Sequence, residues 1–117
     1  MAKIRIKDLL LRTYIGFNPE ELINRQDVII NIEIEALIPE EALRNDEPEG
    51  IYDYKIITKE ITHYVQEGRF KLLEVLTRNL LSLIMNDERV IWAKVEVDKP
   101  HALRFAKSVS FEMEVRR

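Results

Sequence analysis

Apolar and polar residues alternate along four segments of the chain, two near its beginning and two near its end. The first pair covers residues 3–15 and 28–38, and the second pair covers residues 93–98 and 109–115. Successive side chains of a β-strand point to opposite faces of its sheet, so this period of two predicts four strands. The alternation is clean in three of the four segments, which is typical of an antiparallel sheet that is apolar on one face and polar on the other.

The apolar period lengthens to that of a helix between the two pairs of strands. Apolar residues recur every three or four positions over residues 54–65 and again over residues 73–84. Asp53 is suited to cap the first helix, and Gly68 is suited to end it. Two helices joined by a short link pack as an antiparallel pair. We therefore predict an α+β fold of order β-β-α-α-β-β, in which a helix pair covers the apolar face of a four-stranded sheet.

Two irregular segments connect these elements. Residues 16–27 form a loop that contains a glycine, a proline and two adjacent carboxylates. Residues 39–53 are acidic and contain two prolines and a glycine. This composition predicts an irregular connection with a helical turn around residues 40–43.

The two edges of such a sheet predict self-association. An edge strand pairs with another chain unless charge, proline or a cover blocks it. The second strand contains neither proline nor lysine between residues 28 and 38, so we expect the sheets of neighbouring subunits to join edge to edge. Closure into a ring would remove the free edges and would line the inside of a multi-subunit barrel with the polar faces.

The composition narrows the class of protein. A chain of 117 residues suits one domain, so we expect residues 1–117 to form a single domain. A formal net charge of −3 argues against a nucleic-acid partner. The polar first residues and the absence of a long apolar run argue against a signal peptide, a membrane span and any membrane partner. We therefore expect a cytoplasmic protein.

The same composition limits the chemistry. The chain has two histidines and no cysteine, so we expect no metal site. Its three glycines are well separated, which argues against a glycine-rich phosphate loop. What remains is acid–base chemistry by carboxylates, tyrosines and lysines.

Glu21 and Tyr54 are two candidate residues, and each also has a purely structural explanation. Glu21 lies in the loop after the first strand. Its structural explanation is a carboxylate exposed to solvent, and its functional explanation is a general base or a group that orients a general base. Tyr54, at the start of the first helix, is either a core tyrosine or a phenol that passes a proton or binds a substrate oxygen.

Glu74 and Lys99 are two further candidates. Glu74 lies in the first turn of the second helix, where the helix dipole alone favours a carboxylate. Alternatively, it accepts two parallel N–H donors from a planar partner. Lys99 has the parity of the apolar residues of its strand, so its stem is expected on the helix side of the sheet. It is either a lysine that reaches water or a partly desolvated ammonium that stabilises a developing anion.

Four stretches of the sequence together resemble the dihydroneopterin aldolase family of pterin enzymes. They are RTYIGFNPEELINRQD (12–27), YDYKIITKEI (52–61), RFKLLEVLT (69–77) and VEVDKPHALRFAKSVSF (95–111). Each stretch is weak alone, but their order and spacing are specific, and the resemblance covers essentially the whole chain. The NRQD and HALRFAKSVS segments are most similar to the branch that epimerises dihydroneopterin triphosphate.

The resemblance implies a tunnelling fold and a homo-octamer of two stacked rings of four, with active sites at the seams between subunits. It also implies a small-molecule pterin substrate and no cofactor. By position, Glu74 matches the glutamate that anchors the pterin, together with the backbone at Leu73. Lys99 matches the catalytic lysine, and Glu21 matches the loop glutamate near it. Tyr54 matches a tyrosine that reaches in from the adjacent subunit.

The chemistry implied by the resemblance is a retro-aldol cleavage of the C1'–C2' bond of the pterin side chain. Release of the glycolaldehyde fragment makes the enzyme an aldolase, and re-addition of the fragment on its other face makes it a C2' epimerase. A non-catalytic scaffold that keeps only the fold is a third reading, but such a chain is expected to have lost at least one of the four candidate residues, and none is lost.

A triphosphate on the fragment would require cationic contacts near Lys99. His101, Arg104 and Lys107 follow it closely, and Arg12 lies near the end of the first strand. These side chains either bind phosphate or pair with surface carboxylates. Arg104 is the first choice for phosphate, because the guanidinium fork matches phosphate oxygens.

Overall fold

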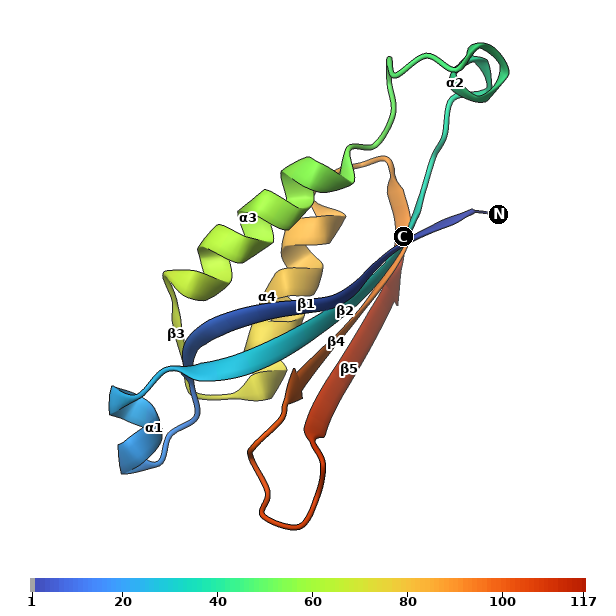
Figure 1. The fold of residues 1–117 in the computed structure, drawn as a ribbon. Helices are drawn as coiled ribbons and strands as arrows, with labels where there is room; N and C mark the ends of the chain where they lie inside the picture. The colour runs from blue at the N-terminus through green and yellow to red at the C-terminus, as the bar shows by residue number, and fades with distance from the viewer. Residues whose placement is uncertain (1) are drawn as a thin grey trace.

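The four long strands and two long helices occur in the order that the sequence predicts, in a computed structural model that describes residues 2–117 (Figure 1). The long elements are β1 (Lys3–Ile15), β2 (Gln26–Ala36), α3 (Tyr54–Gln66), α4 (Leu73–Met85), β4 (Val90–Lys99) and β5 (Val109–Arg116). The short elements are α1 (Pro19–Ile23), α2 (Glu40–Asn45) and β3 (Arg69–Phe70). The predicted helical turn after residue 39 is therefore present as α2, and the predicted loop over residues 16–27 contains the helix α1.

The sheet has five strands in the order β3-β1-β2-β4-β5. Its four long strands are antiparallel neighbours, whereas β3 pairs in parallel with the end of β1. The prediction of a purely antiparallel four-stranded sheet was therefore wrong in this detail. A strand of two residues is too short to show any alternation in the sequence.

The position of β2 corrects the argument about sheet edges. β2 lies between β1 and β4, so it is a central strand and not an edge. Its lack of proline is what a central strand requires, because every N–H group there takes part in pairing. The free edges belong to β5 and to the part of β1 that precedes its short pairing with β3.

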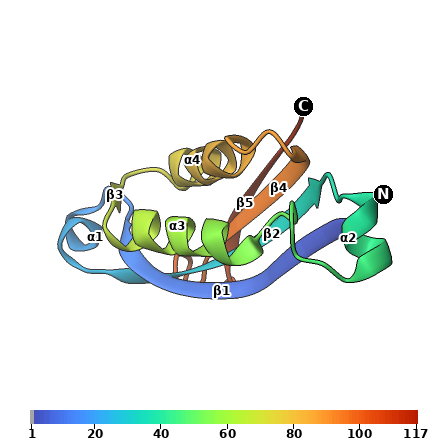
Figure 2. The ribbon, with the colours of Figure 1, turned by 90° about the horizontal axis from the view of Figure 1, so that it is seen from above.

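The two long helices lie side by side on one face of the sheet and run in opposite directions (Figures 1 and 2). Asp53 caps α3 by accepting a hydrogen bond from the Lys55 backbone N–H at 2.9 Å, as its position predicts. Burial of each large apolar side chain between these layers contributes about 1.5–3 kcal/mol. The largest fully buried side chains are Ile15, Ile30, Ile32, Ile34, Ile61, Leu76, Leu80, Ile84, Val28, Val65, Val90 and Val95.

A bulge in β1 changes which of its residues face the helices. The β1–β2 register shifts between Ile6 and Leu9, and Asp8 has a φ of 52°. Asn31 of β2 holds the bulge, because its side chain accepts from the Asp8 N–H at 2.9 Å and donates to the Asp8 carboxylate at 3.2 Å. Odd-numbered residues of β1 therefore face the helices after the bulge, and Tyr14 projects from the opposite face.

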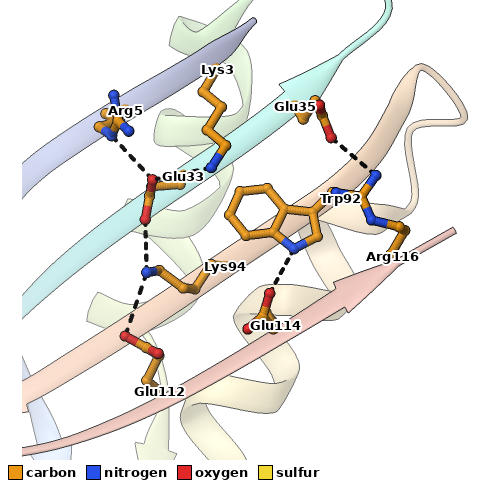
Figure 3. A network of polar contacts seen from close by, with 9 residues as sticks. All are labelled: Lys3, Arg5, Glu33, Glu35, Trp92, Lys94, Glu112, Glu114 and Arg116. Carbon is orange, nitrogen blue, oxygen red and sulfur yellow. Dashed lines mark hydrogen bonds and ion pairs between the residues drawn. The ribbon is translucent and has the colours of Figure 1, made fainter. Parts of the chain in front are cut away.

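The face of the sheet away from the helices carries a network of charges (Figure 3). Glu33 lies at its centre, 3.1 Å from the Arg5 guanidinium and 2.9 Å from the Lys94 ammonium. Lys94 also lies 3.7 Å from Glu112 on β5. Charges of alternating sign thus link four adjacent strands. The polar face is ordered by cross-strand pairs rather than being merely solvated.

No helix within residues 2–117 is both long enough and apolar enough to span a lipid bilayer.

Candidate active site

Lys99 and Glu21 form an ion pair at one end of the sheet. The Lys99 Nζ atom lies 2.5 Å from Glu21 Oε2, and the two side chains are only 14% and 18% exposed. Lys99 is the last residue of β4, while Glu21 belongs to α1, which follows β1. Folding thus brings together two of the predicted site residues that are 78 positions apart.

Two further donors, Gln26 and Asn18, fix the position of the Glu21 carboxylate. The side chain of Gln26 donates to Glu21 Oε2 at 3.2 Å and to the Ile15 carbonyl at 2.7 Å. The backbone N–H of Asn18 donates to Glu21 Oε1 at 3.3 Å. Both carboxylate oxygens therefore have donors, and the Lys99 ammonium is bound to a group that is itself held in place.

Gly16 provides the space in which the Glu21 carboxylate lies. A Cβ atom at Gly16 would sit 2.2 Å from Glu21 Cδ, and the φ of +119° at Gly16 favours glycine. The Gly16 N–H donates to the Phe70 carbonyl at 2.9 Å, which ties this turn to β3. The close approach of backbone and carboxylate therefore requires glycine at position 16.

The charge of Glu21 follows from these contacts. The hydrogen bond from Lys99 lowers the pKa of Glu21 most, burial opposes this effect, and the contacts from Gln26 and Asn18 lower the pKa further. The carboxyl is thus ionised at neutral pH and accepts hydrogen bonds rather than donating them. A poorly solvated ammonium held in this way can stabilise negative charge that develops on a bound molecule.

Glu74 and Leu73 lie at the start of α4. Leu73 is the first residue of the helix, and the preceding Leu72 has no side chain that can accept from the first helical N–H groups. The Glu74 side chain is exposed. The first turn therefore presents backbone donors and a carboxylate acceptor together. Figure 1 shows the start of α4 at the same end of the sheet as α1 and the end of β4.

Tyr54 is not brought to the Lys99–Glu21 pair within one chain. It begins α3 at the end remote from β3, and it is 52% exposed (Figure 1). The explanation of Tyr54 as a core tyrosine is therefore wrong for the single chain. Its expected role in the site of an adjacent subunit stays a prediction.

The basic side chains after Lys99 lie in an open loop. His101, Arg104 and Lys107 are all exposed. The Arg104 guanidinium lies 5.5 Å from the centroid of the Phe105 ring, which is itself 95% exposed. None of these cations has an ion-pair partner among residues 2–117. Their predicted contact with phosphate stays a prediction.

Arg12 is placed differently from the loop cations. Its guanidinium lies 3.4 Å from the Asp27 carboxylate and donates to the Arg25 carbonyl at 3.1 Å. Arg12 is thus engaged in holding the start of β2 against β1. Its predicted contact with phosphate also stays a prediction.

Gln26 and Gly16 are site residues that the sequence reasoning missed. Gln26 has the parity of Val28 and Ile30 in β2, so an extension of the strand by two residues would have placed it on the helix side. For Gly16, the sequence contains no signal of the carboxylate that packs against it.

Over the described part of the chain, no cluster of three or more His, Cys, Asp or Glu side chains could hold a metal ion.

The fold is shared with solved structures of pterin enzymes. A Vibrio cholerae protein described as a dihydroneopterin aldolase (FolB) superimposes with a TM-score of 0.93 at 27% identity, covering 100% of this chain and 98% of that one. The Escherichia coli dihydroneopterin aldolase, solved in complex with neopterin, superimposes with a TM-score of 0.90 at 24% identity, covering 98% and 99%. The predicted α+β tunnelling fold is thereby confirmed.

The family model described as FolB, dihydroneopterin aldolase, matches residues 4–114, so the chain belongs to the dihydroneopterin aldolase family. Two similar relatives carry a more particular name, dihydroneopterin triphosphate 2'-epimerase. The Pseudomonas aeruginosa protein is 51% identical over 114 residues, which cover 97% of this chain and 91% of that protein. The Escherichia coli K12 protein is 44% identical over 117 residues, which cover 99% and 96%. The family resemblance predicted from the sequence is thus confirmed.

Proposed function

We propose that the protein epimerises 7,8-dihydroneopterin triphosphate at C2', giving the dihydromonapterin form. The observation that carries this proposal is the poorly exposed Lys99–Glu21 ion pair, in a chain 51% identical to a protein named for that reaction. The aldolase reaction, which releases glycolaldehyde and 6-hydroxymethyl-7,8-dihydropterin, is the second candidate. It is favoured by the match to the dihydroneopterin aldolase family model.

The proposed reaction is a reversible retro-aldol step. A base removes the proton of the C2' hydroxyl, the C2'–O bond becomes a carbonyl, and the C1'–C2' bond breaks. Its electron pair flows into the dihydropterin ring, which takes up a proton and leaves an enol-like species. Re-addition of C1' to the other face of the aldehyde carbon inverts C2'. In this step the ring releases the proton that it took up and the C2' oxygen regains one, so no atom or electron is gained or lost.

Lys99 is the group proposed to stabilise and protonate the electron-rich pterin intermediate, with Tyr54 of an adjacent subunit managing a second proton. The ionised Glu21 holds the Lys99 ammonium at 2.5 Å. Because Gln26 also donates to Glu21, the pair is fixed before substrate binds. Such preorganised charge is effective because it needs little rearrangement during the reaction.

Glu74 is proposed to anchor the pterin. The 2-amino group and the neighbouring ring N–H form two parallel donors, and an ionised carboxylate can accept both. The exposed carboxylate at the start of α4, beside the free backbone donors at Leu73, supports this role. The anchor would then fix the ring, leaving the side chain of the substrate to extend toward Lys99.

The active assembly is proposed to be an octamer of two stacked four-membered rings, built from single-domain subunits of residues 1–117. The free edges of β1 and β5 support ring formation. The half-exposed Tyr54, far from its own Lys99–Glu21 pair, supports sites shared between neighbours.

The experiment that separates the two activities supplies the protein with 7,8-dihydroneopterin and, separately, with its triphosphate. Inversion at C2' is followed by chiral chromatography, and glycolaldehyde is assayed in the same samples. We expect inversion of the triphosphate with little release of its fragment. Rapid cleavage of the unphosphorylated compound with no action on the triphosphate would establish the aldolase instead.

A further inference from the structure

Two arginines flank one tyrosine in a single row across the sheet. β1 pairs with β3 so that Tyr14 is opposite Arg69. On its other side, the β1–β2 register ends with Thr13 opposite Gln26, which places Arg25 next to Tyr14. The guanidinium carbons of Arg69 and Arg25 lie 3.9 and 5.3 Å from the centroid of the Tyr14 ring. We call these two residues the Tyr14 arginine pair.

The Tyr14 arginine pair has no carboxylate partner in the part of the chain that the structure describes. Within residues 2–117, neither Arg25 nor Arg69 forms an ion pair, whereas the nearby Arg12 is paired with Asp27. The Tyr14 ring attracts both cations, but it leaves their charges uncompensated. Two guanidinium groups of like charge therefore lie close together beside one ring, and a multiply charged anion bound there would neutralise both charges.

Arg69 is held by contacts other than an ion pair. Its guanidinium donates to the Leu22 carbonyl of α1 at 3.2 Å and lies over Tyr14. The segment that carries Arg25 is fixed by the hydrogen bond from Arg12 to the Arg25 carbonyl at 3.1 Å. Because the Arg69 guanidinium is ordered before binding, a ligand that contacts it costs less side-chain entropy than one that contacts the open loop carrying Arg104.

The Tyr14 arginine pair meets the candidate active site through Arg69, while Arg25 lies beside Tyr14 and outside the lining of the hollow that Arg69 and Tyr14 share. One hollow is lined by both Arg69 and Glu21, the partner of Lys99. Lys71 adds a second cation to the lining of the same hollow. The complete lining of this hollow is Tyr14, Gly16, Glu21, Leu22, Arg69, Phe70 and Lys71. A chain of phosphates that begins near Lys99 and Glu21 can therefore enter a region that is already cationic.

We propose that Arg25 and Arg69, with Lys71, form the subsite for the phosphate chain of the pterin substrate, an inference that rests on the proposed function. The fragment cleaved from the ring carries the phosphates, and guanidinium forks bind phosphate in a bidentate way. Retention of the fragment beside Lys99 favours re-addition over release. The Tyr14 arginine pair thus biases the site toward epimerisation.

Substitution of each arginine tests this subsite. Arg25→Gln and Arg69→Gln are assayed with dihydroneopterin triphosphate and with dihydroneopterin, beside Arg104→Gln and the exposed control Arg78→Gln of α4. We expect each variant of the pair to raise KM for the triphosphate about tenfold or more. We also expect more fragment release per inversion, with unchanged kinetics toward dihydroneopterin.

Two results would overturn the subsite. In one, Arg25→Gln and Arg69→Gln both keep the wild-type KM for the triphosphate, whether or not Arg104→Gln raises it. In the other, the rise is equal for the unphosphorylated compound, which would indicate a structural role for the arginines.

A binding measurement keeps the test independent of the proposed reaction. Inorganic tripolyphosphate is titrated calorimetrically into the wild-type protein, the Arg25→Gln/Arg69→Gln double variant and Arg78→Gln, at low ionic strength where charges are weakly screened. We expect binding to the wild type and to Arg78→Gln, and a loss of about 100-fold in the double variant. Absence of binding to the wild type, or equal binding to the double variant, contradicts the subsite even if the enzyme proves to be an aldolase.

Discussion

The ion pair between Lys99 and Glu21 joins the end of β4 to the short helix that follows β1. Each charge is mostly withdrawn from water, and each has the other as its ionic partner. Removing one member of such a pair leaves an uncompensated and poorly solvated charge. The chemistry proposed for the site and the local electrostatics therefore depend on the same contact.

Substitution of Lys99 by methionine tests the role of the ammonium. The stem is retained and the charge is lost, so we expect kcat to fall by about 10²–10⁴-fold, the range typical of a lost acid–base group. KM should change little if Glu74 anchors the pterin. The exposed Lys59→Met provides a matched control that keeps full activity. A Lys99→Met enzyme with wild-type kcat would remove the mechanism.

The sequence predicted the face of the sheet on which the Lys99 side chain lies, but not the residue that it contacts. The parity of Ala93, Val95 and Val97 predicts that its stem lies on the helix side, and its contact with Glu21 agrees with this side. The contact between Lys99 and Glu21 depends on the turn at Gly16, which leaves room for the carboxylate, and on the hydrogen bond that Gln26 donates to it. Both are contacts of the folded chain between residues that no pattern in the sequence links. Patterns along the chain contain no information of that kind.

The turn between β1 and α1 is the element that delivers Glu21 to the site. It combines a glycine with positive φ and a five-residue helix that begins with proline. Any side chain at Gly16 competes directly with the Glu21 carboxylate for space. The conformation of the turn and the position of the charge are therefore coupled.

Gly16→Ala is expected to displace Glu21 and to strain the backbone by about 1–3 kcal/mol. Activity should fall, and the Gly16→Ala/Glu21→Gln double variant should lose no more activity than Glu21→Gln alone, because both changes act on one contact. Gly50→Ala is the control: its φ is also positive, at 76°, and it lies in the connection before α3. It should lose stability but keep activity. Additive activity losses in the double variant would show that Gly16 acts elsewhere.

The charge network on the polar face makes stability depend on pH through Glu33. The contacts with Lys94 and Arg5 lower the pKa of Glu33 below its ordinary 4.5, Lys94 having the larger effect. A lowered pKa stabilises the folded state above the unfolded pKa, and this contribution is lost as the pH falls through the folded pKa. The network should therefore contribute fully at pH 7.

Glu33→Gln is expected to lower the free energy of unfolding by on the order of 1 kcal/mol at pH 7. The difference from wild type should shrink as the pH falls below 4.5, the ordinary pKa of this carboxyl. Urea unfolding at one protein concentration, at pH 7 and at pH 3, measures it. Glu40→Gln, which removes the exposed pair with Arg44, is the control without effect. A deficit that is equal at both pH values would contradict this assignment.

Element boundaries were predictable where the apolar pattern was long. The predicted first strand coincides with β1, and both long helices lie where the period of their apolar residues places them. β3 was missed because two residues carry no period. β2 was taken for an edge because strand order depends on pairing between distant segments, which alternation does not encode.

The whole molecule is proposed to be active only as an assembly. Tyr54 and the Lys99–Glu21 pair lie far apart on one chain, so a site that uses both requires two chains (Figure 1). Symmetric rings repeat such a seam at every interface. A shared site makes a direct prediction about mixtures of defective subunits.

Tyr54→Phe and Lys99→Met subunits, each inactive alone, should regain activity when they are dissociated, mixed and reassembled. Half of the seams receive a native Lys99, and half of those receive a native Tyr54, so about a quarter of the sites should be intact. Sedimentation of the mixed protein confirms reassembly, and reassembled single variants are the controls. Activity of the mixture that stays at the level of those controls would contradict shared sites.

The arrangement of Glu74 and Lys99 about one pterin is the centre of the account. The measurement that tests it most directly is a crystal structure of the assembled protein with neopterin bound. We predict that the Glu74 carboxylate accepts from the 2-amino and ring N–H groups, while the Lys99 ammonium lies beside the C1'–C2' bond. A pterin bound away from Glu74, or a Lys99 remote from the side chain of the ligand in every protomer of the assembly, would contradict the account.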